Sequence, residues 1–454
     1  MKNAMVLVKR IRSEGLAHYS YLIGDRDQAV IIDPRRDVDR YIEVAFQNGM
    51  NITHVLETHR NEDYVIGSLE LEARTGAQIW HAEDQLDYGY GELAKEGQKW
   101  SIGRLKLEAL DTPGHTLGSK SYLLYDPQGN PWMVFCGDVI FSGDVGRIDF
   151  YGEERLGEMA SKLYDSIFNK LLPLGDGIIL CPAHGEGSAC GESIAEREWT
   201  TIGFERERNP KLQVQNEKEF VDMVAEMREY PPYFAKMEKL NLEGPTLSRD
   251  TAHIKFLDPH AFEKVSGDAV ILDTRTVPAF ASSHIPGSLS IWLEGVPGYA
   301  GWFLPYDKPI LLVGETTKAV KYLRRMGYDQ VEGYLSGGMQ SWHVSGRASD
   351  SIDTVTVQRL CGILDAGEDP WILDVRSSRE LKDEGEIPGA EHIHITQLPG
   401  NYDRIPLEEN IYIFCGSGLR SMTAASLLKK QGYGSTVVLG GTAGWKSNTC
   451  PLER

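Results

Sequence analysis

The sequence predicts an α/β protein made of several domains. Short β-branched apolar runs alternate with helical patterns along the chain, and the C-terminal part contains an internal repeat. A length of 454 residues also favours about three domains of roughly 150 residues each. We therefore expect domains at 1–202, 251–349 and 350–454, with a helical linker at 203–250.

The composition excludes several classes of partner. A hydrophobic content of 41% and a charged content of 25% are those of an ordinary globular protein. The net charge of −19, without a basic block, argues against nucleic acid and membrane surfaces. The chain begins with no signal peptide, and its six cysteines are scattered without CxxC pairs. We expect a cytoplasmic protein with reduced thiols.

The first domain alternates predicted strands and helices. Apolar runs predict strands at 5–8, 19–23, 29–32, 52–56, 78–81, 105–110, 122–124, 133–135 and 177–180. Helical patterns cover 37–49, 67–75 and 156–172, and Asp37 is the expected N-cap of the first. In the linker, a helix over 217–229 should end before Pro231 and Pro232.

The C-terminal repeat has three landmarks in the same order. The stretch 271–275 recurs at 372–376, 285–288 recurs at 387–390, and 337–342 recurs at 440–445. Three matched landmarks predict two copies of one domain. Strands near 271 and 311, and near 372 and 411, are separated by helical stretches, which favours a parallel sheet in each copy.

Residues that commonly bind metals follow several predicted strands. His59 follows the strand 52–56, His115 lies in Pro113-Gly114-His115-Thr116, and Asp138 follows the strand 133–135. Two imidazoles and one carboxylate form a facial triad, which leaves three coordination positions open and suits non-haem Fe(II) with O₂ and a substrate. We expect one Fe(II) per chain, although a purified sample could carry zinc or another divalent metal.

His59 also begins a stretch similar to the H-x-H-x-D-H signature of the metallo-β-lactamase fold. Asn61 and Tyr64 occupy two of its histidine positions. An amide is a poor Zn²⁺ ligand and a neutral phenol does not replace imidazole, so these residues weaken a two-metal interpretation and spare a one-metal site. Asp63 and His184 are predicted to orient ligands or bound water. The alternative is a degenerate site that no longer binds a metal.

Residues 1 to about 245 resemble the metallo-β-lactamase-fold persulfide dioxygenases, particularly those fused to rhodanese domains. The matching stretches are 14–18, 32–39, 57–59, 113–116, 137–138, 143–147 and 182–191. The resemblance implies an αββα sandwich with iron ligands at His59, His115 and Asp138. It places Asn61 in an outer shell, and Tyr64 looks like a variant used in those fusions. It further implies a thiol persulfide, O₂ and sulfite as partners, and a homo-oligomer.

A cysteine loop lies in the second repeat copy. Cys415 follows the apolar strand 411–414 and begins Cys415-Gly416-Ser417-Gly418-Leu419-Arg420, ahead of a helix over 421–431. Loop amides and the helix dipole favour the thiolate, the glycines let amides point inward, and Arg420 adds a positive charge. The loop resembles the active site of a rhodanese, and its short length is that associated with sulfur transfer. The alternative is a buried structural cysteine.

The first repeat copy is predicted to be an inactive rhodanese with a structural role. Counting from the shared Ile-Pro-Gly landmark places Val313 at the position of Cys415, and the following segment is shorter. An apolar side chain cannot carry a persulfide.

Two further residues have competing interpretations. Arg147 is a candidate for binding substrate anions, but an ion pair with Asp149 or Asp144 is as well supported. Cys190 lies in a Gly/Ser-rich segment near His184, where a core position is favoured over a place at the metal site.

These patterns predict Fe(II)-dependent oxidation of a low-molecular-weight thiol persulfide to sulfite. A rhodanese sulfur transfer at Cys415 would form thiosulfate. Two alternatives stay open: a binuclear zinc thioester hydrolase of glyoxalase II type, and a non-enzymatic persulfide carrier in which only Cys415 acts.

Overall fold

The protein is described by a computed structural model that covers all residues except 1–5, 189, 192, 249–253 and 448–454. The chain forms two compact units, of which the first comprises Met1–Ser248 together with Arg324–Gly327. Within the described residues, no helix is long and apolar enough to cross a membrane.

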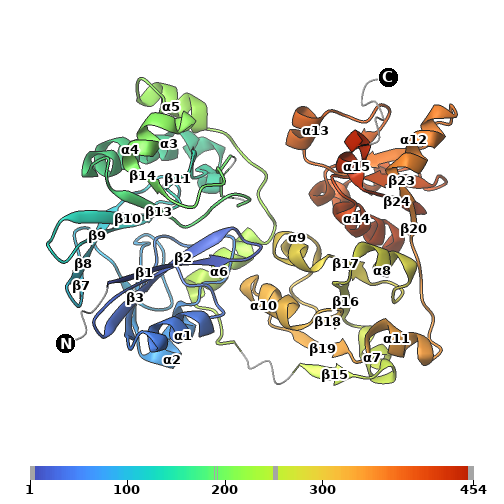
Figure 1. Ribbon diagram of the computed structural model, residues 1–454, viewed down its shortest axis with the longest axis horizontal. Helices are drawn as coiled ribbons and strands as arrows, with labels where there is room; N and C mark the ends of the chain where they lie inside the picture. The colour runs from blue at the N-terminus through green and yellow to red at the C-terminus, as the bar shows by residue number, and fades with distance from the viewer. Residues whose placement is uncertain (1–5, 189, 192, 249–253, 448–454) are drawn as a thin grey trace. The chain divides into compact units, whose positions relative to one another are not determined.

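The first unit contains two six-stranded sheets (Figure 1). One has the order β1-β2-β3-β4-β5-β6 and the other β14-β13-β10-β9-β8-β7, while β11 and β12 pair separately. The strands are β1 (Leu7–Ser13), β2 (His18–Asp25), β3 (Gln28–Ile32), β4 (Asn51–Leu56), β5 (Gln78–His81), β6 (Glu92–Leu93), β7 (Lys99–Ile102), β8 (Leu105–Asp111), β9 (Lys120–Tyr125), β10 (Pro131–Gly137), β11 (Ile140–Phe141), β12 (Asp144–Val145), β13 (Ile179–Pro182) and β14 (Thr200–Thr201).

Helices cover the outer face of each sheet, which makes the expected αββα sandwich. The inner core joins residues of both sheets, such as Ile32 and Phe135. α1 (Asp39–Gln47) and α2 (Ser68–Thr75) pack on the first sheet, and α3 (Leu156–Tyr164) packs on the second. The strands of the two sheets thus end at the edge between two packed layers. The loops that follow these strands can place side chains in a buried site there.

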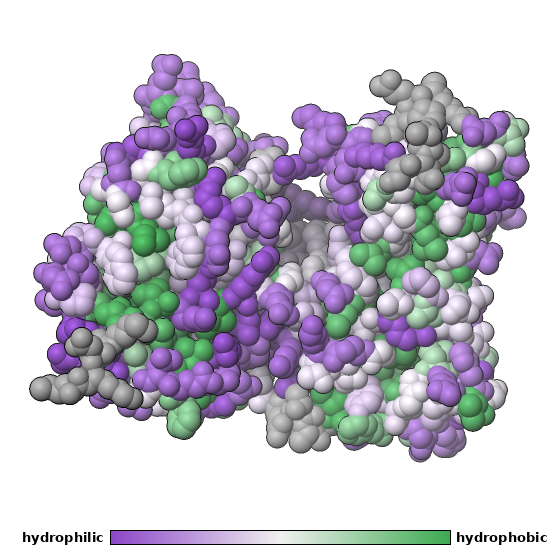
Figure 2. Space-filling view, viewed as in Figure 1, coloured by the Kyte–Doolittle hydropathy of each residue, from purple (hydrophilic) through white to green (hydrophobic). Residues whose placement is uncertain are grey.

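The region 203–248 belongs to the first unit and is helical. It contains α4 (Ile202–Arg208), α5 (Glu217–Val224) and α6 (Phe234–Glu243). α5 buries Phe220 in the core outside the second sheet, while its exposed surface is largely hydrophilic (Figure 2). The helix expected over 217–229 ends earlier, at Val224, ahead of the prolines.

The second unit contains the two repeat copies, each with a five-stranded sheet. The strand orders are β15-β19-β18-β16-β17 and β20-β24-β23-β21-β22, and every pair is parallel. The strands are β15 (Lys255–Leu257), β16 (Val270–Asp273), β17 (Leu289–Ser290), β18 (Ile310–Val313), β19 (Val331–Leu335), β20 (Asp353–Thr356), β21 (Ile372–Asp374), β22 (Glu391–His392), β23 (Ile411–Phe414) and β24 (Ser435–Leu439). The identical order confirms the duplicated α/β domain with parallel sheets.

Helices surround both of these sheets. They are α7 (Pro259–Ser266), α8 (Val277–Ser282), α9 (Val296–Phe303), α10 (Thr317–Arg325), α11 (Gly338–Val344), α12 (Val357–Asp365), α13 (Ser378–Glu384), α14 (Leu419–Lys430) and α15 (Gly441–Ser447). The β16–β18 and β21–β23 pairs have equivalent registers, with Asp273 opposite Val313 and Asp374 opposite Phe414.

This register corrects one sequence assignment. Because Val313 matches Phe414, the residue at the position of Cys415 is Gly314, not Val313. Counting failed because the segment between the Ile-Pro-Gly landmark and the strand differs in length by one residue between the copies. The conclusion is unchanged, since glycine also lacks a nucleophile.

Two other expectations are wrong in detail. Asp37 does not cap α1, whose N-cap is Val38; instead its carboxylate accepts the Arg35 guanidinium at 3.0 Å. Cys361 is disulfide-bonded, so the thiols are not all reduced, whereas Cys136, Cys181, Cys190 and Cys415 are free.

Each repeat copy contains an Asp–Arg pair at the end of an inner strand, and the two pairs differ in burial. Asp374 binds the Arg376 side chain, which is 0% exposed, whereas Asp273 binds the Arg275 side chain, which is 19% exposed. Removing one partner of a buried pair leaves an uncompensated charge, which costs about 3–5 kcal/mol.

We therefore expect Asp374→Ala to destabilise the second copy by about that amount and Asp273→Ala to cost clearly less in the first. Hydrogen exchange of the β21–β23 and β16–β18 amides in the two full-length variants measures each loss locally. Equal losses in the two variants would contradict the dependence on burial.

Candidate metal centre and sulfur-transfer loop

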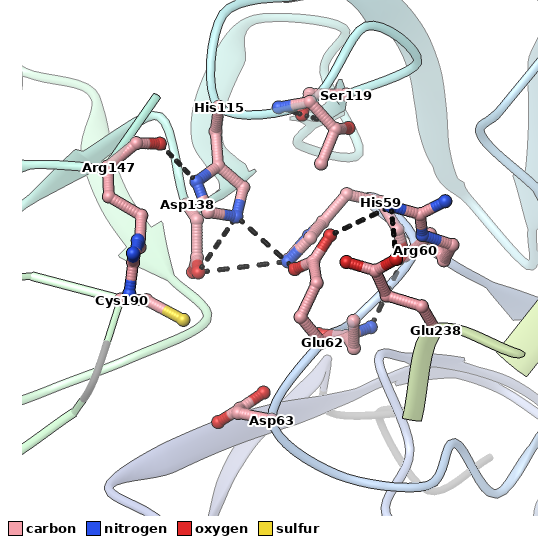
Figure 3. A network of polar contacts seen from close by, with 12 residues as sticks. His59, Arg60, Glu62, Asp63, His115, Ser119, Asp138, Arg147, Cys190 and Glu238 are labelled. Carbon is pink, nitrogen blue, oxygen red and sulfur yellow. Dashed lines mark hydrogen bonds and ion pairs between the residues drawn. The ribbon is translucent and has the colours of Figure 1, made fainter. Parts of the chain in front are cut away.

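Three predicted ligands converge in the first unit. His59 follows β4, His115 lies between β8 and β9, and Asp138 directly follows β10 (Figure 3). The Asp138 Oδ2 atom lies 3.7 Å from His59 Nε2 and 3.5 Å from His115 Nε2. All three residues are buried, and none of these three atoms has a hydrogen-bond partner. Buried lone pairs without partners that face one point are suited to a shared cation.

The free nitrogens are set by hydrogen bonds to the opposite ring nitrogens. Thr58 donates its backbone N–H and its hydroxyl to Asp33, at 2.8 and 2.7 Å. The Thr58 oxygen is therefore left to accept from His59 Nδ1 at 2.8 Å, and the Arg147 carbonyl accepts from His115 Nδ1 at 2.8 Å. Each imidazole thus uses its Nδ1 in this bond and turns its Nε2 toward Asp138, which is the orientation in which a histidine binds a metal.

The surroundings shift the pKa values of the two histidines in opposite directions. Burial lowers the pKa of His59 to about 3, so this imidazole is neutral. Burial also opposes protonation of His115, but the Glu62 and Asp138 carboxylates outweigh it and raise the pKa of His115. The site therefore attracts positive charge, and a divalent cation fits it.

Two glycines allow this close packing. A Cβ on Gly137, whose φ is +52°, would lie 2.6 Å from the Thr58 hydroxyl oxygen. A Cβ on Gly146 would lie 1.9 Å from the Asp138 carbonyl oxygen and 3.1 Å from His115 Nδ1. Any larger residue at either position would displace the groups that orient the ligands.

His184 links Asp138 to Asp63. Its Nδ1 lies 2.7 Å from Asp138 Oδ1 and its Nε2 lies 2.9 Å from Asp63 Oδ2. Carboxylates only accept hydrogen bonds, so both nitrogens donate and the ring is an imidazolium. Burial alone would lower the pKa of His184, but the Asp138 and Asp63 charges raise it well above its usual value.

The altered motif positions are buried and do not reach the ligand atoms by any hydrogen bond. Asn61 donates its amide to the His59 carbonyl at 3.3 Å. Tyr64 donates its hydroxyl to the Asp33 carbonyl at 3.4 Å, and its ring lies against His18 with centroids 4.1 Å apart. Both residues support the loop around His59.

Arg147 and Cys190 complete the surroundings. The Arg147 guanidinium forms two 2.7 Å hydrogen bonds with Asp149, so the ion-pair alternative is correct and the anion-binding role is not supported. Cys190 is buried within ligand distance of His115 and Asp138, and also of Asp63 and His184. It is closer to the metal cluster than expected, although burial and the neighbouring carboxylates hold the pKa of its thiol well above the usual range.

One residue of the cluster was not predicted from the sequence. Glu62 lies between Asn61 and Asp63 in the motif, and its Oε2 atom is 3.6 Å from His115 Nε2. His59, Glu62 and His115 together form a candidate metal-binding group. The only available signal was its position beside the motif, because the direction of a side chain in an irregular loop does not follow from sequence periodicity.

The second unit places the predicted loop around Cys415. The Gly418 amide donates to the Cys415 Sγ atom at 3.0 Å, and Gly418 has a φ of +103°. A Cβ on Gly441 would lie 2.0 Å from the Cys415 carbonyl oxygen. The thiol is buried at the carboxyl end of β23, next to the N-terminus of α14, with Gly416, Ser417 and Leu419 completing the loop.

The charge of Arg420 is shared with a neighbouring helix. Its Nη1 atom donates to Glu380 of α13 at 2.6 Å, and its Nη2 atom also pairs with that carboxylate. Tyr299 of α9, in the first repeat copy, interacts with Arg420 and with Cys415; burial raises the pKa of its hydroxyl while Arg420 opposes that rise. The first repeat copy therefore contributes a side chain to the surroundings of the loop in the second copy.

Comparison with known proteins identifies the domains in which the two sites lie. The metallo-beta-lactamase superfamily model matches residues 14–184, and the rhodanese-like domain model matches 259–345 and 356–448. A solved metallo-β-lactamase from Staphylococcus aureus is 31% identical, with a TM-score of 0.66, over 74% of this chain and 99% of that one.

The chain belongs to the metallo-β-lactamase superfamily. It joins a metallo-β-lactamase domain to tandem rhodanese-like domains. Among relatives of the first domain, a persulfide dioxygenase from Bos taurus is 29% identical over 53% of this chain and 84% of its own length. A hydroxyacylglutathione hydrolase from Haemophilus influenzae is also 29% identical, over 42% of this chain and 91% of its own length.

The Thr58 hydroxyl allows a direct test of ligand orientation. Thr58→Val keeps the shape of the side chain but removes the acceptor of His59 Nδ1, so we expect divalent-metal affinity to fall by about 10- to 100-fold. Competition with a coloured chelator measures the affinity.

Thr53→Val is the matched control. Thr53 lies on β4, the strand that precedes Thr58, and bonds His54 Nδ1 at 2.9 Å, in the same sequence relationship but away from the cluster. An equal loss of affinity in both variants would show that Thr58 acts on β4 as a whole and not through His59.

Proposed function

We propose that this protein is a mononuclear Fe(II) persulfide dioxygenase joined to a rhodanese sulfurtransferase. The observation that carries the proposal is the contrast between two groups of buried histidines. His59 and His115 each keep an unpaired Nε2 facing Asp138, while both nitrogens of His184 are occupied by carboxylates. One cluster has the donor atoms of a metal centre and the other is already neutralised by a proton.

The set of donor atoms favours a site with one iron ion over a site with two zinc ions. Two imidazoles and a carboxylate leave positions open for both O₂ and a sulfur ligand. An iron(II) ion bound there would allow O₂ to react with a closed-shell sulfane sulfur. The similarity to persulfide dioxygenases supports this chemistry, since that relative matches 53% of the chain.

The protein's own residues hold and orient the reacting groups. Phe150 lies beside His115, with ring centroids 5.1 Å apart, and stacks near Phe234 of α6. This aromatic wall excludes water from one side of the cluster. His184 holds Asp138 by its Oδ1 atom, which leaves Oδ2 directed at the metal. The balanced reaction takes one persulfide, one O₂ and one water to one thiol, one sulfite and two protons.

The Cys415 loop is proposed to transfer sulfane sulfur, which has not been oxidised by O₂. The Cys415 thiolate attacks the outer sulfur of a thiol persulfide, whose S–S bond breaks to release the thiol and leave a protein persulfide. Attack by sulfite on the outer sulfur of that protein persulfide breaks its S–S bond, giving thiosulfate and free Cys415. The same persulfide could instead supply the dioxygenase site. The Gly418 amide already donates to Sγ, and such donors stabilise the thiolate that forms and leaves. Homo-oligomeric assembly and a cytoplasmic location stay predictions from the sequence.

A binuclear zinc thioester hydrolase is the competing function. The Asp63, His184 and Cys190 group could hold a second metal, and the hydroxyacylglutathione hydrolase relative supports the alternative. The two proposals differ in metal count: we expect one iron per chain after anaerobic loading. Two zinc ions per chain, with thioester hydrolysis and no O₂ uptake on glutathione persulfide, would replace our proposal.

The two sites can be separated by substitution. His115→Ala removes a metal ligand and should lower O₂ uptake with glutathione persulfide more than about 100-fold. Cys415→Ala should abolish thiosulfate formation and leave O₂ uptake within about twofold of the unsubstituted protein.

An oxygen electrode and thiosulfate chromatography on the same samples measure both outcomes. Unchanged oxidation in His115→Ala would favour the persulfide carrier. Loss of O₂ uptake in Cys415→Ala would disprove the division of labour between the sites.

A further inference from the structure

Glu62 is a buried carboxylate that lies beside the metal cluster without a hydrogen bond. Its side chain is 0% exposed, and neither Oε1 nor Oε2 has a hydrogen-bond partner. Figure 3 shows the carboxylate directed toward the point where His59, His115 and Asp138 meet. Burying an unpaired carboxylate is costly, and a cation bound at this oxygen would offset the cost.

The distances around Glu62 match those of the expected ligands. Its Oε2 atom lies 3.6 Å from His115 Nε2, between the 3.5 and 3.7 Å that separate Asp138 Oδ2 from the two histidines. Two atoms that each bind one ion at about 2.1 Å lie roughly 3 to 4 Å apart. Glu62 is therefore placed as Asp138 is, with respect to His115.

Arg60 forms an ion pair with Glu62, but not with Glu62 alone. The Arg60 guanidinium lies 3.7 Å from Glu62 Oε1, and it lies closer, 3.4 Å, to Glu238 Oε2. One guanidinium is thus shared between two carboxylates. The other Glu62 oxygen, Oε2, faces His115 and has no hydrogen-bond partner.

We propose that Glu62 is a fourth protein ligand of the metal. This inference rests on the proposed mononuclear centre and extends it from a 2-His-1-carboxylate to a 2-His-2-carboxylate set. Two carboxylates balance the charge of a divalent ion. A six-coordinate metal then keeps two open positions, one for the persulfide sulfur and one for O₂, in place of three.

The test uses the full-length protein loaded with Mn(II), without O₂ or persulfide. Electron–nuclear double resonance in ¹⁷O-labelled water counts the metal-bound waters, and chelator competition gives the affinity. We expect two bound waters in the unsubstituted protein. Glu62→Gln should bind three waters and lose more than about 100-fold in affinity, because a ligand is lost and not merely an outer-shell partner.

Glu238→Gln is the matched control, because Glu238 pairs with the same Arg60 but lies outside the cluster. It should keep two waters and nearly full affinity. A second variant, Glu62→Asp, keeps the carboxylate and should be weaker than the unsubstituted protein but tighter than Glu62→Gln. Circular dichroism of each variant verifies folding.

Three bound waters in the unsubstituted protein, or equal effects of Glu62→Gln and Glu238→Gln, would show that Glu62 is only a counter-ion of Arg60. These measurements do not depend on the reaction. A protein that binds two waters through Glu62 but does not oxidise persulfide would overturn the proposed function and leave this ligand in place.

Discussion

Buried lone pairs that face one another without hydrogen bonds are the constraint on which the first unit depends. Each unsatisfied buried polar atom costs about 1–3 kcal/mol, and His59, His115 and Asp138 each contribute one at the same point. One bound cation would offset these costs together, so the proposed metal would also stabilise the folded state. The same constraint explains why Gly137 and Gly146 are needed, since any side chain there would separate the groups that hold the ligands.

A proton takes the role that a second metal has in a two-metal site. Asp138 uses one oxygen toward the histidine pair and the other toward His184, whose imidazolium also binds Asp63. A carboxylate between two cations is a common arrangement in binuclear centres. Here the His184 imidazolium takes the place of one of these cations. An imidazolium needs no metal ligands around it, so the replacement of two motif histidines by Asn61 and Tyr64 is compatible with this arrangement.

The sequence was sufficient to locate residues that directly follow a strand with a clear apolar pattern. His59, Asp138 and Cys415 each follow an apolar strand, and a strand end fixes the place of the next side chain. Glu62 could not be found in this way because it lies in an irregular loop, where its direction depends on tertiary packing. The role of Tyr299 was equally hidden, since it reaches Cys415 from the other repeat copy. The Gly314 position was misassigned because counting cannot detect a one-residue change in a connecting segment.

The two sites manage buried negative charge by different physical means. At the first site the charge resides on carboxylates, and Arg60 and His184 lie beside them as cations. At Cys415 the charge would be a single thiolate, and backbone amides with a helix N-terminus suffice for it. Arg420 is largely neutralised by Glu380, so its main effect on the loop is to hold it in shape. A thiolate stabilised by weak dipoles remains a good nucleophile and a good leaving group, whereas strong pairing with a full positive charge would hold the sulfur in place. The weaker arrangement suits the sulfur transfer that we propose for Cys415.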